Sequence, residues 1–332
     1  MQIPGHPVLC NYYLTYRCNA TCSFCDIWEK PSPYASLSNI ESNLQHLKKL
    51  GVKVIDFTGG EPLLHGEIGE ILRLAKKYGF ITTLTTNCLL YPKKAEAIRG
   101  LVDMLHFSLD SPLEEEHNAS RGVDCFRFFR ESLETAKSLG ETPDILFTVF
   151  RKNLHHIHQV WEEYARQRNL MLLLNPVFQY NQVETGESFS SDDLKELRHW
   201  GKKKNVFLNE AFLVLREKGG NQIDNPVCRA GSSTIVISPE NEYILPCYHL
   251  GIASLPVDNN LSEVFHSEKA RSLRMLEGRL PGCRGCTINC YMQPSFTTNL
   301  NRYWLLSAPS ALKYNLKKGT WRKLLAGRGI PS

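Results

Sequence analysis

The feature that most constrains the fold is an alternation of short apolar runs and helix-patterned segments through the first half of the chain. The apolar runs predict strands at residues 9–15, 52–60, 80–87, 104–110, 144–150 and 170–177. Segments with apolar residues every three to four positions predict helices at 36–51, 66–79, 94–101, 126–140 and 154–169. Strands that alternate with helices pair in parallel, and nearly continuous apolar strands predict a sheet covered by helices. The pattern leaves two α/β architectures open, a doubly wound sheet and a closed or partial barrel.

Polar residues gather where the predicted strands end. The first predicted strand is followed by Cys18, Cys22 and Cys25, and Gly59-Gly60-Glu61-Pro62 stands at the end of the second. The third strand ends in Asn87, the fourth in Ser108 and Asp110, and the sixth has Asn175 near its end. The carboxyl ends of parallel strands meet at one edge of a sheet, which is where ligands bind in α/β folds. We therefore expect these side chains to share one pocket.

The pattern changes after about residue 226. Residues 228–247 predict a β-hairpin, 261–276 predict a helix, and a cysteine-rich stretch follows. We interpret the chain as a core at 1–225, a small metal-stapled module at 226–295 and a basic tail at 296–332.

The chain has 11 cysteines, which is many for a protein with no visible secretory signal and no long apolar run. These two features predict a cytoplasmic protein, where clustered cysteines more often bind metal than form disulfides. Eight cysteines fall into groups: Cys18, Cys22 and Cys25; Cys228 and Cys247; Cys283, Cys286 and Cys290. The isolated Cys10, Cys88 and Cys125 are interpreted as small buried hydrophobic residues.

The first group has three thiols within eight residues. Structural zinc sites usually combine a C-x2-C pair with a distant second pair. Three ligands on one loop suit a cubane iron–sulfur cluster, whose fourth iron then stays open for another ligand.

These motifs carry a resemblance to a known family. "CNATCSFC" followed by "TGGEPLL", "TTNCLL" and "FSLDSPLEEEHNASRG", and then "CRAGSSTIVISPENEYILPC" and "CRGCTINC", resembles the SPASM/twitch subgroup of the radical S-adenosylmethionine (SAM) superfamily. The resemblance spans about residues 9–292. It implies a partial (β/α)6 TIM-like barrel with a C-terminal β-hairpin and helix module. One departure is Cys88, where the subgroup usually has glycine; we expect a different backbone conformation there, or a thiol near the cofactor.

The resemblance also implies roles for residues. Cys18, Cys22 and Cys25 would bind three irons of a [4Fe–4S] cluster, and SAM would bind the fourth. Gly59, Gly60 and Glu61 would meet the amino group of SAM, Ser108 and Asp110 its ribose, and Arg121 its carboxylate. Phe24, Asn87 and Asn175 complete the candidate cofactor residues. Reductive cleavage of SAM would give a 5′-deoxyadenosyl radical that takes hydrogen from a peptide, sugar or lipid-type substrate, in a net oxidation or other modification.

The second group of cysteines allows more than one assignment. A twitch-type auxiliary [4Fe–4S] cluster would take Cys228, Cys247, Cys283 and Cys286, and would leave Cys290 over. In an alternative assignment, Cys290 replaces Cys283. Five cysteines favour one auxiliary cluster rather than two. No catalytic acid or base can be assigned, and the candidates are Tyr180, Glu184, Tyr248 and His249.

The net charge of +5 comes from the tail, because the residues after Leu300 include seven basic and no acidic side chains. Basic and apolar residues together suit peripheral contact with an anionic membrane, an acidic substrate or nucleic acid. A helix packed on the barrel is the simpler interpretation. The main alternative function is a zinc-stapled nucleic-acid-binding protein, which leaves the polar strand ends unexplained. The enzyme interpretation implies an external electron donor such as flavodoxin or ferredoxin.

Overall fold

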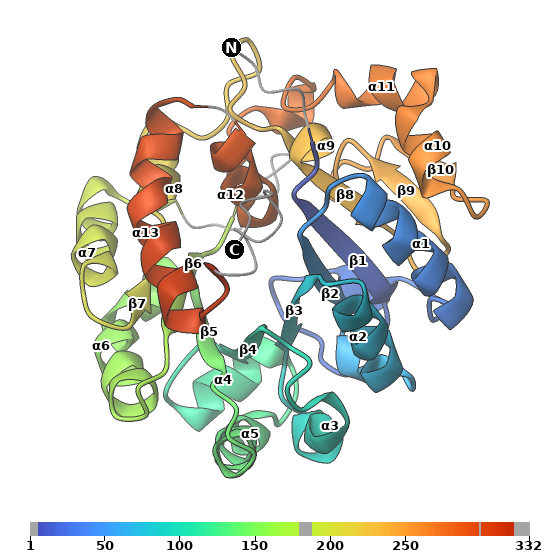
Figure 1. Cartoon of the computed structure of the whole chain (residues 1–332). Coiled ribbons are helices and arrows are strands. Elements are labelled where there is room, and N and C mark those ends of the chain that lie inside the picture. The colour runs from blue at the N-terminus through green and yellow to red at the C-terminus, as the bar shows by residue number, and fades with distance from the viewer. Residues whose placement is uncertain (1–5, 179–187, 299, 322–332) are drawn as a thin grey trace, which may run out of the picture.

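The computed structural model describes residues 6–178, 188–298 and 300–321. Its centre is a curved ten-stranded sheet in the order β10-β9-β8-β1-β2-β3-β4-β5-β6-β7 (Figure 1). The strands are β1 (Leu9–Thr15), β2 (Val54–Gly59), β3 (Ile81–Thr86), β4 (Met104–Leu109), β5 (Asp144–Val149), β6 (Leu172–Pro176), β7 (Val206–Phe207), β8 (Thr234–Ile237), β9 (Glu242–Leu245) and β10 (Ala253–Pro256). Strands β1 to β8 pair in parallel, whereas β9 and β10 pair in antiparallel fashion. All six predicted parallel strands are confirmed.

The helices lie mainly on the outside of this curve (Figure 1). They are α1 (Leu37–Lys49), α2 (Ile68–Lys77), α3 (Tyr91–Ile98), α4 (Glu114–Arg121), α5 (Phe126–Ser138), α6 (Ile157–Val160), α7 (Ser191–Gly201), α8 (Glu210–Glu217), α9 (Ala230–Ser233), α10 (Leu261–His266), α11 (Glu268–Arg274), α12 (Asn289–Thr298) and α13 (Arg302–Lys318). A partial barrel with helices outside, and not a doubly wound sheet, is therefore the architecture. No helix in these residues is long and apolar enough to cross a membrane.

Two predicted helices differ from the structure. The segment predicted at 154–169 is a 3-10 helix at Arg151–His156, then α6, then a π-helix at Trp161–Arg166. The segment predicted at 261–276 is divided into α10 and α11, because the Ser267 side chain accepts a hydrogen bond from the Ala270 backbone and so begins a new helix.

The two faces of the sheet have different chemistry. The outward-facing residues of each strand, such as Tyr12 of β1 and Phe57 of β2, pack with Ile40 and Leu44 of α1 in the main hydrophobic core. Residues of the opposite parity face the concave interior, and many of them are polar. The interior of the barrel is thus available for polar ligands.

The hairpin of the C-terminal module is confirmed, because β8 and β9 pair with Ile237 opposite Tyr243. Strand β8 also pairs with β1, so the module continues the sheet of the barrel. The boundary predicted at residues 225 and 226 stays a prediction.

Helix α13 runs alongside α8, in front of β6 and β7, and contacts α12 (Figure 1). The Tyr314 hydroxyl donates to Asp144 of β5 at 2.5 Å, and Lys318 Nζ lies 3.0 Å from the other Asp144 oxygen. Lys313 Nζ donates to the carbonyls of Lys203 and Val206. Two tail lysines therefore bind the barrel, as a packed helix requires, and membrane contact by the tail stays a prediction.

Candidate functional site

The loop after β1 carries the first three cysteines, and the end of α4 holds it in place. The backbone amides of Thr21 and Ser23 donate to the carbonyls of Arg121 and Ser120, at 3.0 and 3.1 Å. Gly122 adopts a φ of +65°, and a Cβ at this position would lie 2.2 Å from Thr21 Oγ1. The Arg-Gly pair at the end of α4 therefore has a structural role that the sequence did not indicate: it docks the cysteine loop.

The three thiols differ in exposure. Cys18 and Cys22 are partly buried, whereas Cys25 is exposed. Burial raises the pKa of the Cys18 thiol to about 11 and also raises those of Cys22 and Cys25. Two donors stand beside the sulfurs: Asn87 Nδ2 is 3.9 Å from Cys18 Sγ, and Arg121 Nη1 is 3.9 Å from Cys22 Sγ. Such donors fit thiolates that carry negative charge.

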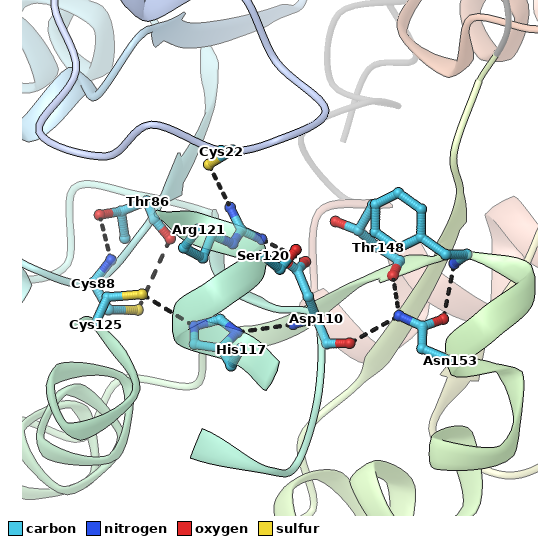
Figure 2. A network of polar contacts seen from close by, with 11 residues as sticks. Cys22, Thr86, Cys88, Asp110, His117, Ser120, Arg121, Cys125, Thr148 and Asn153 are labelled. Atoms are coloured by element: carbon cyan, nitrogen blue, oxygen red, sulfur yellow. Dashed lines mark hydrogen bonds and ion pairs between the residues drawn. The ribbon is translucent and has the colours of Figure 1, made fainter. Parts of the chain in front are cut away.

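Asp110 and Arg121 form a buried ion pair beside this loop (Figure 2). Arg121 Nη2 lies 2.7 Å from Asp110 Oδ1, and the Ser120 hydroxyl donates to Asp110 Oδ2 at 2.9 Å. Arg121 Nε is buried and has no hydrogen-bond partner among the residues that the structure describes. The sequence predicted contacts of Asp110 with the ribose and of Arg121 with the carboxylate of SAM. The structure pairs these two residues with each other, and their contacts with SAM stay predictions.

Two further residues, His117 and Asn153, hold the backbone of Asp110 in position (Figure 2). The Asp110 amide donates to His117 Nδ1 at 3.1 Å, and Asn153 Nδ2 donates to the Asp110 carbonyl at 2.8 Å. Burial lowers the pKa of His117 to about 4, so the ring is neutral at pH 7 and its Nε2 lies 3.2 Å from Cys125 Sγ. Asn153 and Cys125 were missed as site residues. Cys125 is buried as predicted, but its sulfur also has a polar partner.

Gly59 and Gly60 are required by their contact with the end of β1. A Cβ on Gly59 would lie 2.0 Å from the Thr15 carbonyl oxygen, and one on Gly60 would lie 2.1 Å from that of Arg17. The Gly60 amide donates to the Thr15 carbonyl at 2.9 Å. Close approach between two parts of the backbone therefore explains these glycines before any cofactor is considered.

Glu61 joins the ends of β2 and β3. Its Oε1 accepts from the Leu63 amide and the Thr86 hydroxyl, at 3.1 and 2.9 Å, and its Oε2 accepts from the Asn87 amide at 2.9 Å. Burial raises the pKa of this carboxyl to about 7, although the hydrogen bonds oppose the rise. Both carboxyl oxygens thus have partners within the protein, which makes Glu61 a positioning residue in this structure.

Two other candidates at the strand ends are buried. Cys88 has a φ of +72°, the left-handed region that glycine favours, so a different backbone conformation is a wrong prediction. Its thiol is fully buried and lies 3.9 Å from the Thr86 carbonyl oxygen. Ser108 is also buried, on β4. The ring of Phe24 lies 5.3 Å from that of Phe150, and the Arg121 guanidinium lies 5.4 Å from the Phe24 ring.

The second group of cysteines surrounds one small cavity. It is lined by Cys228, Cys247, Cys283 and Cys286, together with mainly apolar neighbours that include Leu250 and Ile288. Cys290 is not among the lining residues. The lining of this cavity agrees with the assignment in which Cys290 is not a ligand of the auxiliary cluster.

Asn221 organises this cavity, a role that no sequence pattern indicated. Its buried Nδ2 donates to the carbonyls of Gly278 and Cys283, at 2.8 and 3.1 Å. Its Oδ1 accepts from the amides of Val227 and Cys228. One side chain therefore ties the segment before β8 to the C-x2-C turn. An asparagine has this capacity because its amide combines donors with an acceptor.

Of the remaining candidates, the structure describes Tyr248, His249 and Asn175. Tyr248 stacks on Tyr13 with ring centroids 4.5 Å apart, and Lys30 Nζ donates to the Tyr248 hydroxyl at 2.8 Å. Burial lowers the pKa of His249 to about 4. Asn175 of β6 accepts a hydrogen bond from Asn289 of α12. Tyr180 and Glu184 lie outside the described residues.

In the described part of the chain, no three or more His, Cys, Asp and Glu side chains are grouped so that they could hold one metal ion. A single tetrahedral ion needs its thiolates within about 4 Å of one another, whereas in a cubane each thiolate binds a different iron.

Comparisons with known proteins agree with this description. Residues 12–162 match the family model described as "Radical SAM superfamily". The subtilosin biosynthesis protein AlbA of Bacillus subtilis is 25% identical over 284 residues, which cover 78% of this chain and 58% of AlbA. The GTP 3′,8-cyclase of Chlorobaculum tepidum is 27% identical over 192 residues, which cover 55% of this chain and 58% of the cyclase. The chain thus spans 58% of the length of both relatives.

Two solved structures show that the fold is shared well beyond the barrel. The structure of anSMEcpe with bound AdoMet has a TM-score of 0.63 at 18% identity, covering 98% of this chain and 100% of that one. The structure of Streptococcus suis SuiB bound to precursor peptide SuiA has a TM-score of 0.68 at 16% identity, covering 90% of this chain and 74% of SuiB. The matched part therefore includes the C-terminal module.

Proposed function

We propose that this chain is a radical SAM enzyme that modifies a peptide with SAM and two [4Fe–4S] clusters. The observation that carries the peptide assignment is the extent of the match to AlbA. That match covers 78% of this chain, whereas the matches to the GTP cyclase and to an AdoMet-dependent haem synthase cover 55% and 45%. The relative named for bacteriocin biosynthesis is thus similar to much more of the chain.

The residues present fit both clusters. Cys18, Cys22 and Cys25 would hold the first cluster and leave one iron for SAM, and Cys228, Cys247, Cys283 and Cys286 would hold the second. When bound, the first cluster supplies the electron that cleaves SAM to a 5′-deoxyadenosyl radical, which takes hydrogen from the substrate. An external donor such as flavodoxin or ferredoxin would supply that electron in the cytoplasm.

The protein side chains have defined tasks around the first cluster. Arg121 presents a cation to Cys22, and its buried, unpartnered Nε is suited to a further negative group. Asn87 presents an amide donor to Cys18. These donors stabilise thiolates whose pKa values burial would otherwise raise. Asp110 and Glu61 orient Arg121 and Asn87 respectively.

The test begins with anaerobic reconstitution of the chain with iron and sulfide, which should give about eight irons per chain, four per cluster. The reconstituted enzyme should then form 5′-deoxyadenosine from SAM and a reductant. Candidate substrates are the short peptides encoded beside its gene, and a mass change in one of them identifies the product. The variant with Cys18, Cys22 and Cys25 replaced by alanine is the control and should give neither product.

Two outcomes would contradict the proposal. Binding of zinc without iron, together with salt-dependent binding of nucleic acid, would favour the non-enzymatic alternative. SAM cleavage that modifies a nucleotide or a sugar, and no peptide, would keep the enzyme and overturn the peptide assignment.

A further inference from the structure

A row of polar side chains crosses the concave face of the barrel below the predicted SAM site. The strand register places Asn11 of β1 beside Asp56 of β2, and Asp56 beside Thr83 of β3. Neighbouring residues in register point to the same side of a parallel sheet. The residues on either side of Asp56, Ile55 and Phe57, belong to the outer hydrophobic core, so Asp56 faces the interior.

Asp56 and Asn11 have hydrogen-bonding capacity that the described residues do not use. Asn11 is 3% exposed, and its buried Oδ1 has no partner among them. Asp56 has no hydrogen bond or ion pair with any described residue, although its side chain keeps partial contact with solvent. Burial raises the pKa of Asp56 to about 7. Two oxygen acceptors thus lie on neighbouring strands without a donor among the residues that the structure describes.

Helix α12 brings a thiol to the same place. Its first turn crosses the interior. Asn289 donates a hydrogen bond to Asn175 of β6. Tyr291 contacts the side-chain amide of Asn11 on β1, which opposes the rise that burial causes in the pKa of the Tyr291 hydroxyl. Between these two anchors stands Cys290, whose side chain is exposed. Because Asn11 is the register neighbour of Asp56, this first turn of α12, with Cys290, lies over the same part of the sheet. The exposed thiol shows that solvent reaches this part of the interior.

We propose that Asp56 and Asn11 form a substrate subsite for a positively charged nitrogen group, with Cys290 at its rim. A guanidinium or ammonium group offers several N–H donors, and its positive charge would compensate the negative charge of the Asp56 carboxylate. The substrate class is therefore a peptide with a basic side chain or a free amino terminus in the chamber. The inference rests on the proposed function, because it treats the barrel interior as the place where the substrate binds.

The test uses the alkylation of Cys290 in the cluster-loaded enzyme as its readout. The other cysteines should not react with an alkylating agent. Cys10, Cys88 and Cys125 have no exposed surface, and the remaining cysteines would bind iron. Iodoacetamide should therefore label Cys290 first, as peptide mass spectrometry can show. Butylguanidinium should slow this reaction, whereas butylurea, which has a similar shape and no charge, should not.

A matched pair of variants assigns the effect to the carboxyl. Asp56→Asn should weaken the protection by butylguanidinium about tenfold, the loss expected for a charged hydrogen bond. Asp258→Asn, which changes an exposed carboxyl beyond β10, should leave the protection unchanged. Equal protection by the two probes, protection that persists in Asp56→Asn, or no alkylation at Cys290 would each overturn the subsite. The probe comparison in the wild-type enzyme decides the question if Asp56→Asn fails to fold.

Failure of the subsite and failure of the proposed function have different signatures. Cleavage of SAM without guanidinium protection would overturn the subsite and keep the enzyme. Guanidinium protection without any SAM cleavage would keep the subsite and overturn the function. A charged peptide and its neutral analogue can then replace the probes, to show whether the basic group acts within a peptide.

Discussion

The two groups of cysteines are built in opposite ways. The first lies on a loop with an exposed thiol. Backbone amides of this loop donate to carbonyls of α4, and a polar network lies beside it. The second lines a cavity with apolar neighbours, and a buried asparagine ties its two halves together. Metal sites that react keep a coordination position open, whereas structural sites are closed by protein ligands. We therefore expect the chemistry at the loop, and in the cavity a cluster whose irons all have thiolate ligands.

The largest expected effect comes from removing one group of cysteines at a time. Replacing Cys18, Cys22 and Cys25 by alanine should remove about half of the iron and all of the 5′-deoxyadenosine. Replacing Cys228 and Cys247 should remove the other half of the iron and keep SAM cleavage measurable. Iron analysis and chromatography of the nucleoside check both results. SAM cleavage that survives the first variant would reverse the assignment of the two groups.

The polar network beside the loop gives the next largest effect. Asp110→Asn should lower the free energy of unfolding by ~3–5 kcal/mol, because it leaves the buried Arg121 without its ionic partner. Urea unfolding of the iron-free chain measures the change. Glu70→Gln is the control, since its pair with Arg73 is exposed and should contribute less than about 1 kcal/mol. Similar losses in the two variants would show that the network is not what holds the loop.

The dependence on pH tests Glu61, which has no counterpart among the ligands of the cavity. Its folded pKa is raised by burial from 4.5 to about 7, so the folded state binds the proton more tightly than the unfolded state. Its contribution to stability is therefore complete below pH 4.5 and is lost as the pH rises to about 7. Relative to Glu61→Gln, the wild-type chain should lose ~3 kcal/mol across this window. A constant difference between the two proteins at all pH values would contradict the raised pKa.

A pair of glycines gives the smallest effect and the most local one. Gly122→Ala should destabilise the protein by ~1–3 kcal/mol and weaken iron binding at the first group alone, because its Cβ would collide with Thr21. Gly140→Ala has a similar φ of +72° and nothing within 4 Å, so it measures the cost of the backbone conformation by itself. Equal iron contents in the two variants would show that α4 does not position the cysteine loop.

The sequence predicted the fold better than the site. The parallel strands were located within two residues, because their apolar runs alternate regularly with helical patterns. Helix α4 was missed, since its sequence EEEHNASR contains almost no apolar residue to show a period. The cysteines could be grouped by spacing, yet Cys290 became distinguishable from Cys283 only once the cavity was known.

The partners of the predicted site residues could not be obtained from the sequence for a physical reason. Asp110 contacts Arg121 and Asn153 because three chain segments converge, and no local pattern records that convergence. Asn221 likewise acts across 57 and 62 residues of chain. Ser108, by contrast, was predicted at a strand end and is found there, buried, because strand patterns are local.

Helix α13 has a consequence for the biogenesis of the protein. Residues 302–318 leave the ribosome after all the clustered cysteines, yet they supply Tyr314 and Lys318 to the buried Asp144. During translation every clustered thiol is therefore made before the side chains that contact Asp144 at the amino end of β5.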